Sequence, residues 1–393
     1  MTIRIPLAKP EITEADRDAV LSVLRTPHLS TGPKLEEFER AICNYTGSKH
    51  AVAVNSGTSA LHLAIRALNL ERGSEVILPS FSFSALLNVI LQEGLRPKFV
   101  DIDPATYNTS PELVERAITK RTRLILAVHT FGIPVDVGMM LDASTAAVRG
   151  RGGPSHPVHV IEDACEALGA EVRGQKAGTL GEAGLFAFYP NKQITTGEGG
   201  VLVTADDSLA AKARVLRNQG RDPGLDWLQN VEVGFSYRIS DINCALGTSQ
   251  LARIEKVIEQ RQKLARAYDR VLAKIEGIKR PCVTSAVGRI SWFVYVVRLT
   301  DEFTRSDRDR ICETMGRRGI ATGRYFAPLH KQPVFTESSF GNAADSGTCA
   351  LVHTEAVADR VIALPFFNQL AKTEVQEVCG ALDESIRELR RRM

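Results

Sequence analysis

The chain of 393 residues is 44% hydrophobic and 24% charged, so it can bury a large core, and its length predicts two or three domains. Its 49 basic and 46 acidic residues leave a net charge of +3. That charge is too small over this length to favour nucleic acid or a membrane surface as a partner. No run approaches the ~18 apolar residues that span a bilayer, and the N-terminus lacks the apolar core of a signal peptide.

The cysteines point to a reducing environment. Seven cysteines lie at least 30 residues apart, which excludes a compact zinc site and a dense disulfide framework. We therefore expect reduced thiols, no metal centre and a cytoplasmic location. The cysteines are Cys43, Cys165, Cys244, Cys282, Cys312, Cys349 and Cys379.

Hydrophobic patterning predicts an α/β fold. Two amphipathic segments, Glu14–Leu24 and residues 34–45, predict N-terminal helices. Beyond them, short apolar runs alternate with turns and helical periods. Because these runs are apolar at both alternating positions, they predict a mainly parallel sheet covered by helices on both faces. The seven runs are residues 51–54, 76–78, 97–100, 124–128, 158–161, 184–188 and 200–203.

The C-terminal part predicts a smaller α+β domain. Residues 240–251 and 253–275 predict helices, the second long enough to link two domains. The predicted division is a large domain at 1–250, followed by the linking helix and the small domain at 251–393. The small domain should contain strands at 292–297 and near 321–326 and helices at 305–318 and 372–391.

The first candidate site is residues 55–60, Asn-Ser-Gly-Thr-Ser-Ala, between the first strand and a helix predicted at 60–68. A helix N-terminus presents unpaired N–H groups and the positive end of its dipole. Gly57 permits close approach, and Thr58 and Ser59 add hydroxyl donors, a combination that suits phosphate. Plain capping of the helix by Ser or Thr is the alternative, and the segment alone does not decide between them.

Two carboxylates, Glu162 and Asp163, follow the apolar run at 158–161. Adjacent strand residues point to opposite faces, so only one of them can face a pocket at the strand end. A buried carboxylate needs a cationic or hydrogen-bonding partner. A helix cap or a surface ion pair is the alternative explanation.

Lys192 lies in a turn between two apolar strands, among aromatic residues, Pro190, two threonines and three glycines. This setting favours removal of its ammonium group from water. A desolvated lysine is a usable amine nucleophile, as Schiff-base chemistry requires. A structural lysine that donates to a loop carbonyl is the alternative.

The three candidate sites share one interpretation. Pyridoxal phosphate needs a phosphate anchor, a partner for its pyridinium nitrogen and an amine for a Schiff base. Residues 55–60, Asp163 and Lys192 match these needs in turn. Phe83, which follows another strand, is a candidate for stacking on the ring, although an aromatic residue there more commonly joins the core.

In order along the chain, these motifs resemble the DegT family of sugar aminotransferases, pyridoxal-phosphate enzymes of fold type I. The resemblance covers nearly the whole chain. It rests on Ile5-Pro6, Thr31-Gly32-Pro33, residues 55–62, Glu162-Asp163-Ala164, Asn191-Lys192, residues 195–200 and 238–243, Pro328-Leu329-His330 and Leu364-Pro365.

The resemblance implies a role for each candidate residue. Lys192 would form the Schiff base and move a proton between the substrate carbon and the cofactor, and Asp163 would pair with the pyridine nitrogen. Glu166 would lie near the 3-oxygen of the cofactor, as in the branch of GDP-perosamine synthases. The remaining contacts would be Phe83 on the ring, Gly57, Thr58 and Ser59 on the phosphate, and Tyr189, Tyr325 and His330 in the sugar-nucleotide pocket.

Some positions depart from the family pattern. Ala187 stands where many relatives have a phosphate-binding serine, and Ser236 where many have an asparagine that reaches the phosphate of the neighbouring subunit. The cradle is therefore expected to lack a donor, for which Ser236 or Arg238 would compensate. The segment at residues 138–159 is longer than in most relatives, and it is expected to form a surface insertion without a catalytic role.

The resemblance also implies a reaction. Relatives that dehydrate deoxysugars have histidine in place of Lys192, so the lysine favours transamination. L-Glutamate would donate the amino group to a nucleotide-linked keto sugar, with a 4-keto-6-deoxyhexose as first choice. A 3-keto sugar or keto-cyclitol substrate stays open, as do a non-catalytic sugar-nucleotide-binding regulator and another fold type I reaction such as elimination or decarboxylation. Family members share active sites across a dimer interface, so a homodimer is expected.

Overall fold

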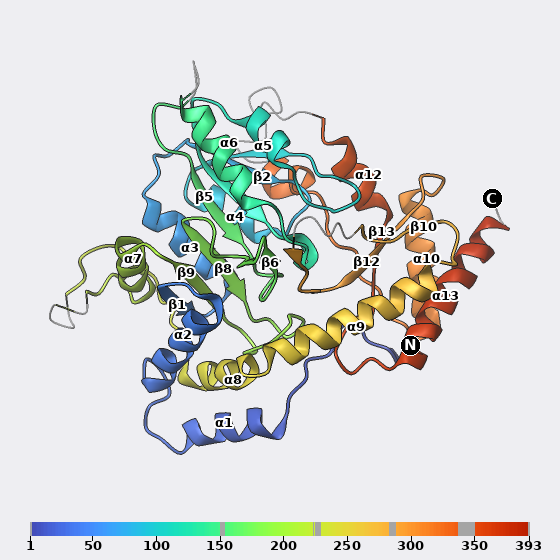
Figure 1. The fold of residues 1–393 in the computed structure, drawn as a ribbon, viewed down its shortest axis with the longest axis horizontal. Coiled ribbons are helices and arrows are strands. Elements are labelled where there is room, and N and C mark those ends of the chain that lie inside the picture. Colours follow the sequence, from blue (N-terminus) through green and yellow to red (C-terminus); the bar gives the residue numbers. More distant parts are fainter. Residues whose placement is uncertain are drawn as a thin grey trace.

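The computed structural model describes residues 2–149, 154–222, 224, 229–282, 288–336 and 350–391. Figure 1 shows a large sheet between helices, from which the long helix α9 (Ile254–Leu272) runs to a second group of strands and helices. Within the described residues, no helix is long and apolar enough to cross a membrane. The six cysteines that the structure describes are unpaired, and Cys349 lies outside the described residues.

The large sheet has seven strands in the order β1-β9-β8-β5-β4-β2-β3. β9 runs antiparallel to both β1 and β8, whereas the other neighbours pair in parallel. The prediction of a seven-stranded, mainly parallel sheet is therefore confirmed. The strands are β1 (His50–Val54), β2 (Glu75–Pro79), β3 (Arg96–Val100), β4 (Thr122–Val128), β5 (His159–Asp163), β8 (Ala183–Ala187) and β9 (Gly200–Thr204).

Alternate residues of each strand enter separate hydrophobic cores on the two faces of the sheet. On β1, Val52 and Val54 pack into the core that contains α3 (Gly57–Leu68), α4 (Ala85–Gln92) and α7 (Asp207–Arg217). Ala51 and Ala53 face the opposite core, with α2 (Pro33–Thr46), α8 (Asp241–Leu251) and the start of α9. Burial on both faces is why these strands are apolar at consecutive positions.

The prediction of a surface insertion at 138–159 is wrong for most of that segment. Residues 137–149 form α6 (Val137–Arg149), which crosses over from β4 to β5 beside α5 (Pro111–Ala117). Val137 and Met140 of α6 pack in one core with Ile125 of β4 and Val160 of β5. The segment is therefore part of the helical layer that covers the sheet, and residues 150–153 lie outside the described residues.

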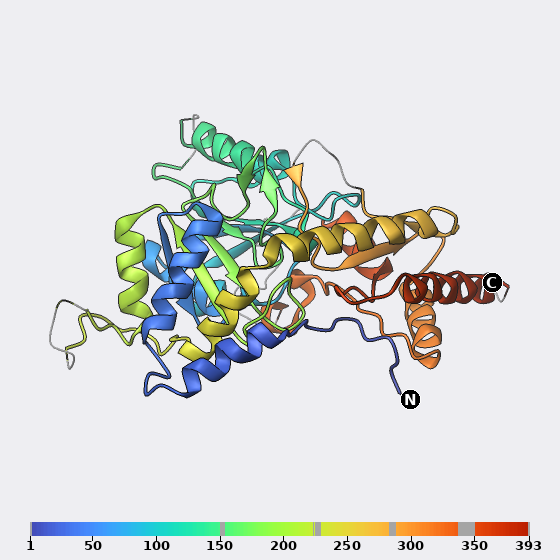
Figure 2. The same ribbon diagram turned by 60° about the horizontal axis from the view of Figure 1, so that its bottom comes forward.

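Beyond α9, β10 (Ile278–Lys279), β12 (Tyr295–Leu299) and β13 (Val361–Leu364) form an antiparallel sheet. It packs with α10 (Arg305–Arg317), α13 (Lys372–Arg390) and one side of α9 around a core that includes Tyr268, Tyr295 and Leu382. α12 (Val352–Arg360) lies beside α10. Figure 2 shows α9 bridging from the large sheet to this group. The division at residue 250 stays a prediction.

Two features of the C-terminal part differ from expectation. The strand predicted near 321–326 is wrong: Gly323 makes only an isolated bridge to Ala363, and the chain then turns toward the large sheet. The third strand of the small sheet is β13, which the sequence pattern did not predict.

A third sheet joins the two parts of the chain. β11 (Gly288–Arg289) returns from the C-terminal part to pair with β6 (Glu171–Val172), next to β7 (Gln175–Lys176). The remaining elements are α1 (Glu14–Leu24), which packs on α8, the short helices η1 (Thr130–Gly132) and η2 (Leu329–Lys331), and α11 (Pro333–Thr336).

Candidate active site

Several strand ends meet at one edge of the large sheet. Because β9 runs against its neighbours, its first residue, Gly200, pairs with Val54 and Ala187, the last residues of β1 and β8. β5, next to β8, ends at Asp163. The predicted cradle, the carboxylates and the turn with Lys192 therefore all leave the sheet at this edge, where ligands bind in open α/β sheets.

The segment after β1 begins helix α3 with a side-chain cap, and it also presents main-chain amides of the kind that bind anions. α3 begins at Gly57, and the Ser56 hydroxyl accepts a hydrogen bond from the Ser59 amide at 3.1 Å. The Ser59 hydroxyl donates to Asn55 Oδ1 at 2.6 Å, so both donors of Ser59 act within this cap. The amides of Gly57 and Thr58 precede the first possible intrahelical bond, and Thr58 is exposed. These two residues offer the donors that the cap does not use.

The helix start is packed too tightly for a side chain at Gly57. A β-carbon there would lie 2.8 Å from the β-carbon of Ala187 and 3.1 Å from the Cys165 sulfur. One at Gly200 would lie 2.4 Å from the Ser56 carbonyl oxygen. Ala187 thus lies directly against the cradle. The small residues bring the backbone of three segments together at the point where the predicted phosphate would be held.

The structure separates the two adjacent carboxylates. Glu162 is fully buried and accepts hydrogen bonds from His129 Nε2 at 3.0 Å and from three amides of the loop at residues 178–181 at 2.6–2.7 Å. His129 Nδ1 accepts from the Val135 amide, which leaves the ring proton on Nε2. Glu162 is therefore structural. Asp163 is partly exposed at the strand end, where its Oδ1 accepts from the Cys165 amide at 3.0 Å.

Lys192 lies between a carboxylate and an aromatic ring. Its Nζ is 3.5 Å from Glu166 Oε1 and 4.0 Å from the centroid of the Phe293 ring. The side chains of Lys192 and Glu166 are each 13% exposed. The other oxygen of Glu166 accepts from the Phe131 amide at 2.8 Å. The turn thus holds the amine in a largely dehydrated setting, as the sequence predicts.

Burial raises the pKa of the Glu166 carboxyl, and the nearby Asp163 raises it further, although Lys192 and the Phe131 amide act in the opposite direction. The net direction is upward from the ordinary value of 4.5. A carboxyl with a raised pKa binds its proton more readily in the folded chain than in the unfolded chain. Its favourable contribution is therefore present at low pH and is lost as the pH rises through the raised pKa.

We expect Glu166→Gln to change the pH dependence of stability. As the pH rises from 4.5, the melting temperature of the parent should fall relative to that of the variant, because only the parent must ionise a buried carboxyl. Differential scanning fluorimetry across this range measures the difference. Glu259→Gln is the control: Lys263 lowers the pKa of the exposed Glu259, so its contribution is lost only as the pH falls below 4.5, and the parent–variant difference should stay level over this range. A parent–Glu166→Gln difference that is flat or rises with pH would contradict the expectation.

Tyr325, from the C-terminal part, lies close to Glu166 and Asn191. Burial raises the pKa of its phenol, and Glu166 raises it further, while a hydrogen bond from the Asn191 side chain lowers it. The Tyr325 ring lies 6.2 Å from the Phe293 ring. Asn191 Oδ1 is buried without a hydrogen-bond partner among the described residues. Tyr189, also predicted to line the pocket, is 52% exposed.

Two other predicted residues differ in their surroundings. Phe83, just before α4, is 59% exposed, so its ring is accessible to a ligand. His330 is held at both ring nitrogens, by the Ser80 hydroxyl at 2.6 Å and Glu355 at 3.1 Å. A direct substrate contact by His330 would require it to give up one of these bonds. Both assignments stay predictions.

The segment with Ser236 and Arg238 runs beside the cradle. The carbonyl of Tyr237 accepts from the Asn55 amide at 3.0 Å. Ser236 is exposed, and Arg238 donates to Asn218 Oδ1 at 3.1 Å. The structure therefore brings both predicted residues near the start of α3 along the backbone, and their phosphate contacts stay predictions.

Several residues around Lys192 lie outside the predicted motifs. Phe293 comes from the C-terminal part, and its amide bonds to the Phe131 carbonyl at 3.2 Å. The Gln193 side chain donates to the Glu166 carbonyl at 2.6 Å, and Arg261 of α9 donates to the Lys192 carbonyl at 3.3 Å. Only Gln193 adjoins a predicted motif. The others carry no local signal, because long-range packing alone brings them to the turn.

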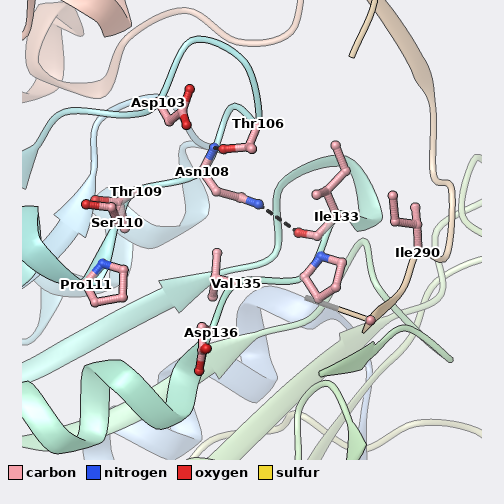
Figure 3. A pocket seen from close by; sticks show the side chains of 12 residues that line it. Asp103, Thr106, Asn108, Thr109, Ser110, Pro111, Ile133, Val135, Asp136 and Ile290 are labelled. Atoms are coloured by element: carbon pink, nitrogen blue, oxygen red, sulfur yellow. Dashed lines mark hydrogen bonds between the residues drawn. The ribbon is translucent and has the colours of Figure 1, made fainter. Parts of the chain in front are cut away.

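A separate cavity of about 160 Å³ lies behind the loop that supports Glu166. Figure 3 shows Asn108 at its wall, donating to the Ile133 carbonyl at 2.9 Å, and the same side chain accepts from the Thr130 amide. Asn108 thus holds the turn whose Phe131 amide contacts Glu166. None of the predicted site residues line this cavity. Among the residues that the structure describes, no cluster of His, Cys, Asp or Glu could hold a metal ion.

A mainly parallel seven-stranded sheet with an amine, a carboxylate and a helix N-terminus at one edge has the groups that a fold type I pyridoxal-phosphate enzyme requires. The chain belongs to the DegT/DnrJ/EryC1/StrS aminotransferase family, whose model matches residues 10–383. The predicted family is confirmed, and the chain is a sugar aminotransferase of this family.

Individual relatives agree over nearly the whole chain. It is 37% identical to the GDP-perosamine synthase of Caulobacter vibrioides, over 97% of this chain and 98% of that protein. The Streptococcus pneumoniae protein Spr1654 in its PLP form has a TM-score of 0.90 at 26% identity, covering 98% of this chain and 99% of that one. PseC of Helicobacter pylori, an aminotransferase of pseudoaminic acid biosynthesis, has a TM-score of 0.88 at 26% identity, covering 98% and 99%. The predictions of fold type and of pyridoxal phosphate as cofactor are confirmed at this level.

Proposed function

We propose that this aminotransferase moves the amino group of L-glutamate to a nucleotide-linked keto sugar, with a 4-keto-6-deoxyhexose as first choice, in amino-deoxysugar biosynthesis. The observation that carries the proposal is the approach of Lys192 Nζ to Glu166 and to the Phe293 ring, at the sheet edge that also holds Asp163 and the start of α3. Similarity over nearly the full length to GDP-perosamine synthase supports a nucleotide-linked sugar as acceptor.

The residues at this edge fit pyridoxal phosphate. Gly57 and Gly200 let the start of α3 pack directly against Ala187 and the start of β9, and the Gly57 and Thr58 amides at that helix start are the donors that would hold a phosphate. The buried Asn191 Oδ1 has no hydrogen-bond partner among the described residues. This acceptor, adjacent to Lys192 in sequence, could accept a hydrogen bond from a bound ligand. When bound, pyridoxal phosphate supplies an aldehyde for the lysine amine and an electron-withdrawing ring.

Three side chains would do the chemical work. Lys192 would bind the cofactor covalently and then, once released, carry a proton between the substrate carbon and the cofactor. Asp163, with one oxygen held by the Cys165 amide, would use its charge to keep the pyridine nitrogen protonated. Glu166, whose pKa burial raises, would hold a proton toward the 3-oxygen while it orients the Lys192 amine.

The remaining assignments divide between the cofactor and the sugar nucleotide. Gly57 and Thr58 would donate to the phosphate, whereas Ser59 would act through the cap, because its donors are already used. Ser236 or Arg238 would replace the donor that Ala187 lacks. Phe83 would stack on the ring, and Tyr189, Tyr325 and His330 would line the sugar-nucleotide pocket.

A screen with ¹⁵N-glutamate tests this proposal. The purified protein is offered nucleoside-diphosphate-linked 4-keto-6-deoxyhexoses, 3-keto sugars and keto-cyclitols, and nitrogen transfer is followed by mass spectrometry. The first choice predicts labelled product from a 4-keto sugar alone. Label in a 3-keto sugar or a keto-cyclitol would instead support the alternative substrates.

Two outcomes of the same screen would overturn the proposal. Binding of sugar nucleotides without transfer to any of them would indicate a non-catalytic regulator with the same fold. Turnover of an amino acid without a keto acid that gains or loses nitrogen would indicate an elimination or a decarboxylation. The close approach of an amine and a carboxyl in a buried pocket favours transfer over the regulator.

We also propose a homodimer in the cytoplasm. Val231 and Val233, just before the segment with Ser236 and Arg238, are 52% and 77% exposed, and a partner chain would cover them. The unpaired cysteines suit a reducing compartment. Sedimentation velocity should give twice the chain mass for the parent, and Val233→Lys should shift the distribution toward the single chain. A parent that sediments as a single chain would contradict the dimer.

A further inference from the structure

Arg261, in the middle of α9, is a buried cation whose hydrogen bonds all go to main-chain carbonyls. Its side chain is 4% exposed. Nη1 donates to the carbonyls of Trp292 and Phe293 at 3.2 and 3.0 Å, and Nη2 donates to the carbonyl of Lys192 at 3.3 Å. One guanidinium therefore binds both the turn that carries Lys192 and the segment that carries Phe293.

The charge of Arg261 is not neutralised by a contacting carboxylate among the described residues. Burial lowers its pKa to about 10, with a smaller opposing effect of Glu11, so the group is still protonated at neutral pH. The Phe366 ring lies 5.5 Å from the guanidinium carbon. A buried cation carries a large desolvation penalty, and an apolar side chain of similar size is often at least as stabilising. The planar fork of donors is what an apolar residue cannot supply.

The joined segments set the surroundings of the Lys192 amine. Its Nζ lies 4.0 Å from the Phe293 ring centroid, while the Phe293 and Lys192 carbonyls are both held by Arg261. On the other side, Gln193 Nε2 donates to the carbonyls of Glu166 and Ser291 at 2.6 and 2.9 Å. Gln193 therefore joins the Glu166 backbone to Ser291, and Arg261 joins the Lys192 backbone to Phe293, so both neighbours of the amine are tied to the segment at 291–293.

From this geometry we propose that Arg261 is a positioning residue: it acts through the Lys192 backbone to hold the amine between Glu166 and the Phe293 ring. This inference rests on the proposed role of Lys192. Its chemical consequence follows from proximity, because displacement of a reacting group by about 1 Å lowers rates by as much as about 10²-fold.

Three variants test the proposal on the full chain. Arg261→Met removes the fork, and Arg261→Lys keeps the charge and part of the donor set. Arg308→Met is the control for loss of a buried arginine, since Arg308 is also 4% exposed and donates to the Ala358 carbonyl at 2.9 Å. Arg308 differs in pairing with Asp309 at 2.8 Å, and it does not contact the Lys192 turn. For each protein we would measure the melting temperature without cofactor and the rate at which pyridoxal phosphate becomes fixed to Lys192 on borohydride reduction. Mass spectrometry identifies the labelled lysine, and steady-state assays give kcat and KM.

We expect Arg261→Met to slow labelling of Lys192 and to lower kcat by about 10- to 100-fold, with little change in KM. Arg261→Lys should recover part of both rates. Arg308→Met should lose thermal stability and label Lys192 at the parental rate.

Two results would overturn the positioning role while the parent still labels at Lys192. One is a parental labelling rate and kcat in Arg261→Met. The other is that Arg308→Met loses labelling rate in the same proportion to its loss of melting temperature as Arg261→Met does. The slower labelling would then reflect lost stability alone. Labelling of the parent at a different lysine would instead overturn the assignment of Lys192, and the positioning role with it.

Discussion

Lys192→Ala is expected to reduce nitrogen transfer from glutamate by about 10⁴-fold or more, because one substitution removes both the amine nucleophile and the proton carrier. The variant should fold, since the Lys192 side chain makes a single long contact at 3.5 Å with Glu166 and lies over one aromatic ring. Transfer of ¹⁵N to the accepted sugar, measured alongside the melting temperature, checks both parts.

Two further variants make this result specific. Lys192→Arg keeps a cation beside Glu166 but is expected to be as inactive as the alanine variant, because a guanidinium does not form the Schiff base. Lys263→Ala, on an exposed face of α9, should keep parental activity. Transfer at the parental rate by Lys192→Ala would show that the amine has no part in the reaction.

Asp163→Asn is expected to lower the rate of transfer by up to about 10³-fold with the fold intact. A charge pair at about 4 Å contributes on the order of 4 kcal/mol at an effective dielectric near 20, which sets the upper limit of the loss. The asparagine keeps an oxygen for the Cys165 amide, so the local hydrogen bond survives. Steady-state kinetics and the absorbance of bound cofactor against pH would reveal the loss of the charge.

The neighbouring residue provides a control for Asp163→Asn. Glu162→Gln places an amide group where four donors converge, from His129 and the loop at 178–181. It should therefore lower the free energy of unfolding by about 1–3 kcal/mol. Activity of the folded fraction should change little. If Asp163→Asn loses stability and Glu162→Gln loses rate, the roles of the two carboxylates are reversed.

The motifs at strand ends were predictable because they are local. A buried run, a turn and a helix start place residues 55–60, Asp163 and Lys192 at one edge of any parallel sheet. The local pattern alone does not decide the choice between Glu162 and Asp163, which the joint interpretation with pyridoxal phosphate assigns to Asp163. It depends on the fold of the loop at 178–181 around Glu162, and no spacing in the sequence encodes that contact.

The wrong predictions also have physical causes. The expectation of an insertion at 138–159 rests on the length of that segment, and length does not show that Val137 and Met140 of α6 pack into a core under the sheet. Residues 321–326 are extended, but they pair at one position only, because Gly323 meets β13 where the chain turns away. Neither the ring of Phe293 nor the guanidinium of Arg261 could be assigned to the site, since both reach it through contacts between distant segments.

The distance along the chain between Lys192 and Phe293 has a consequence for biosynthesis. All strands of the large sheet are synthesised before α9, so the strands can pair during translation, whereas the core that contains the start of α9 is completed later. Arg261, which holds the Lys192 carbonyl, follows the lysine by 69 residues, and Phe293, whose ring faces the amine, follows it by about a hundred. A nascent chain therefore acquires its scaffold first and its reactive lysine setting last, and a prematurely terminated product would keep the former without the latter.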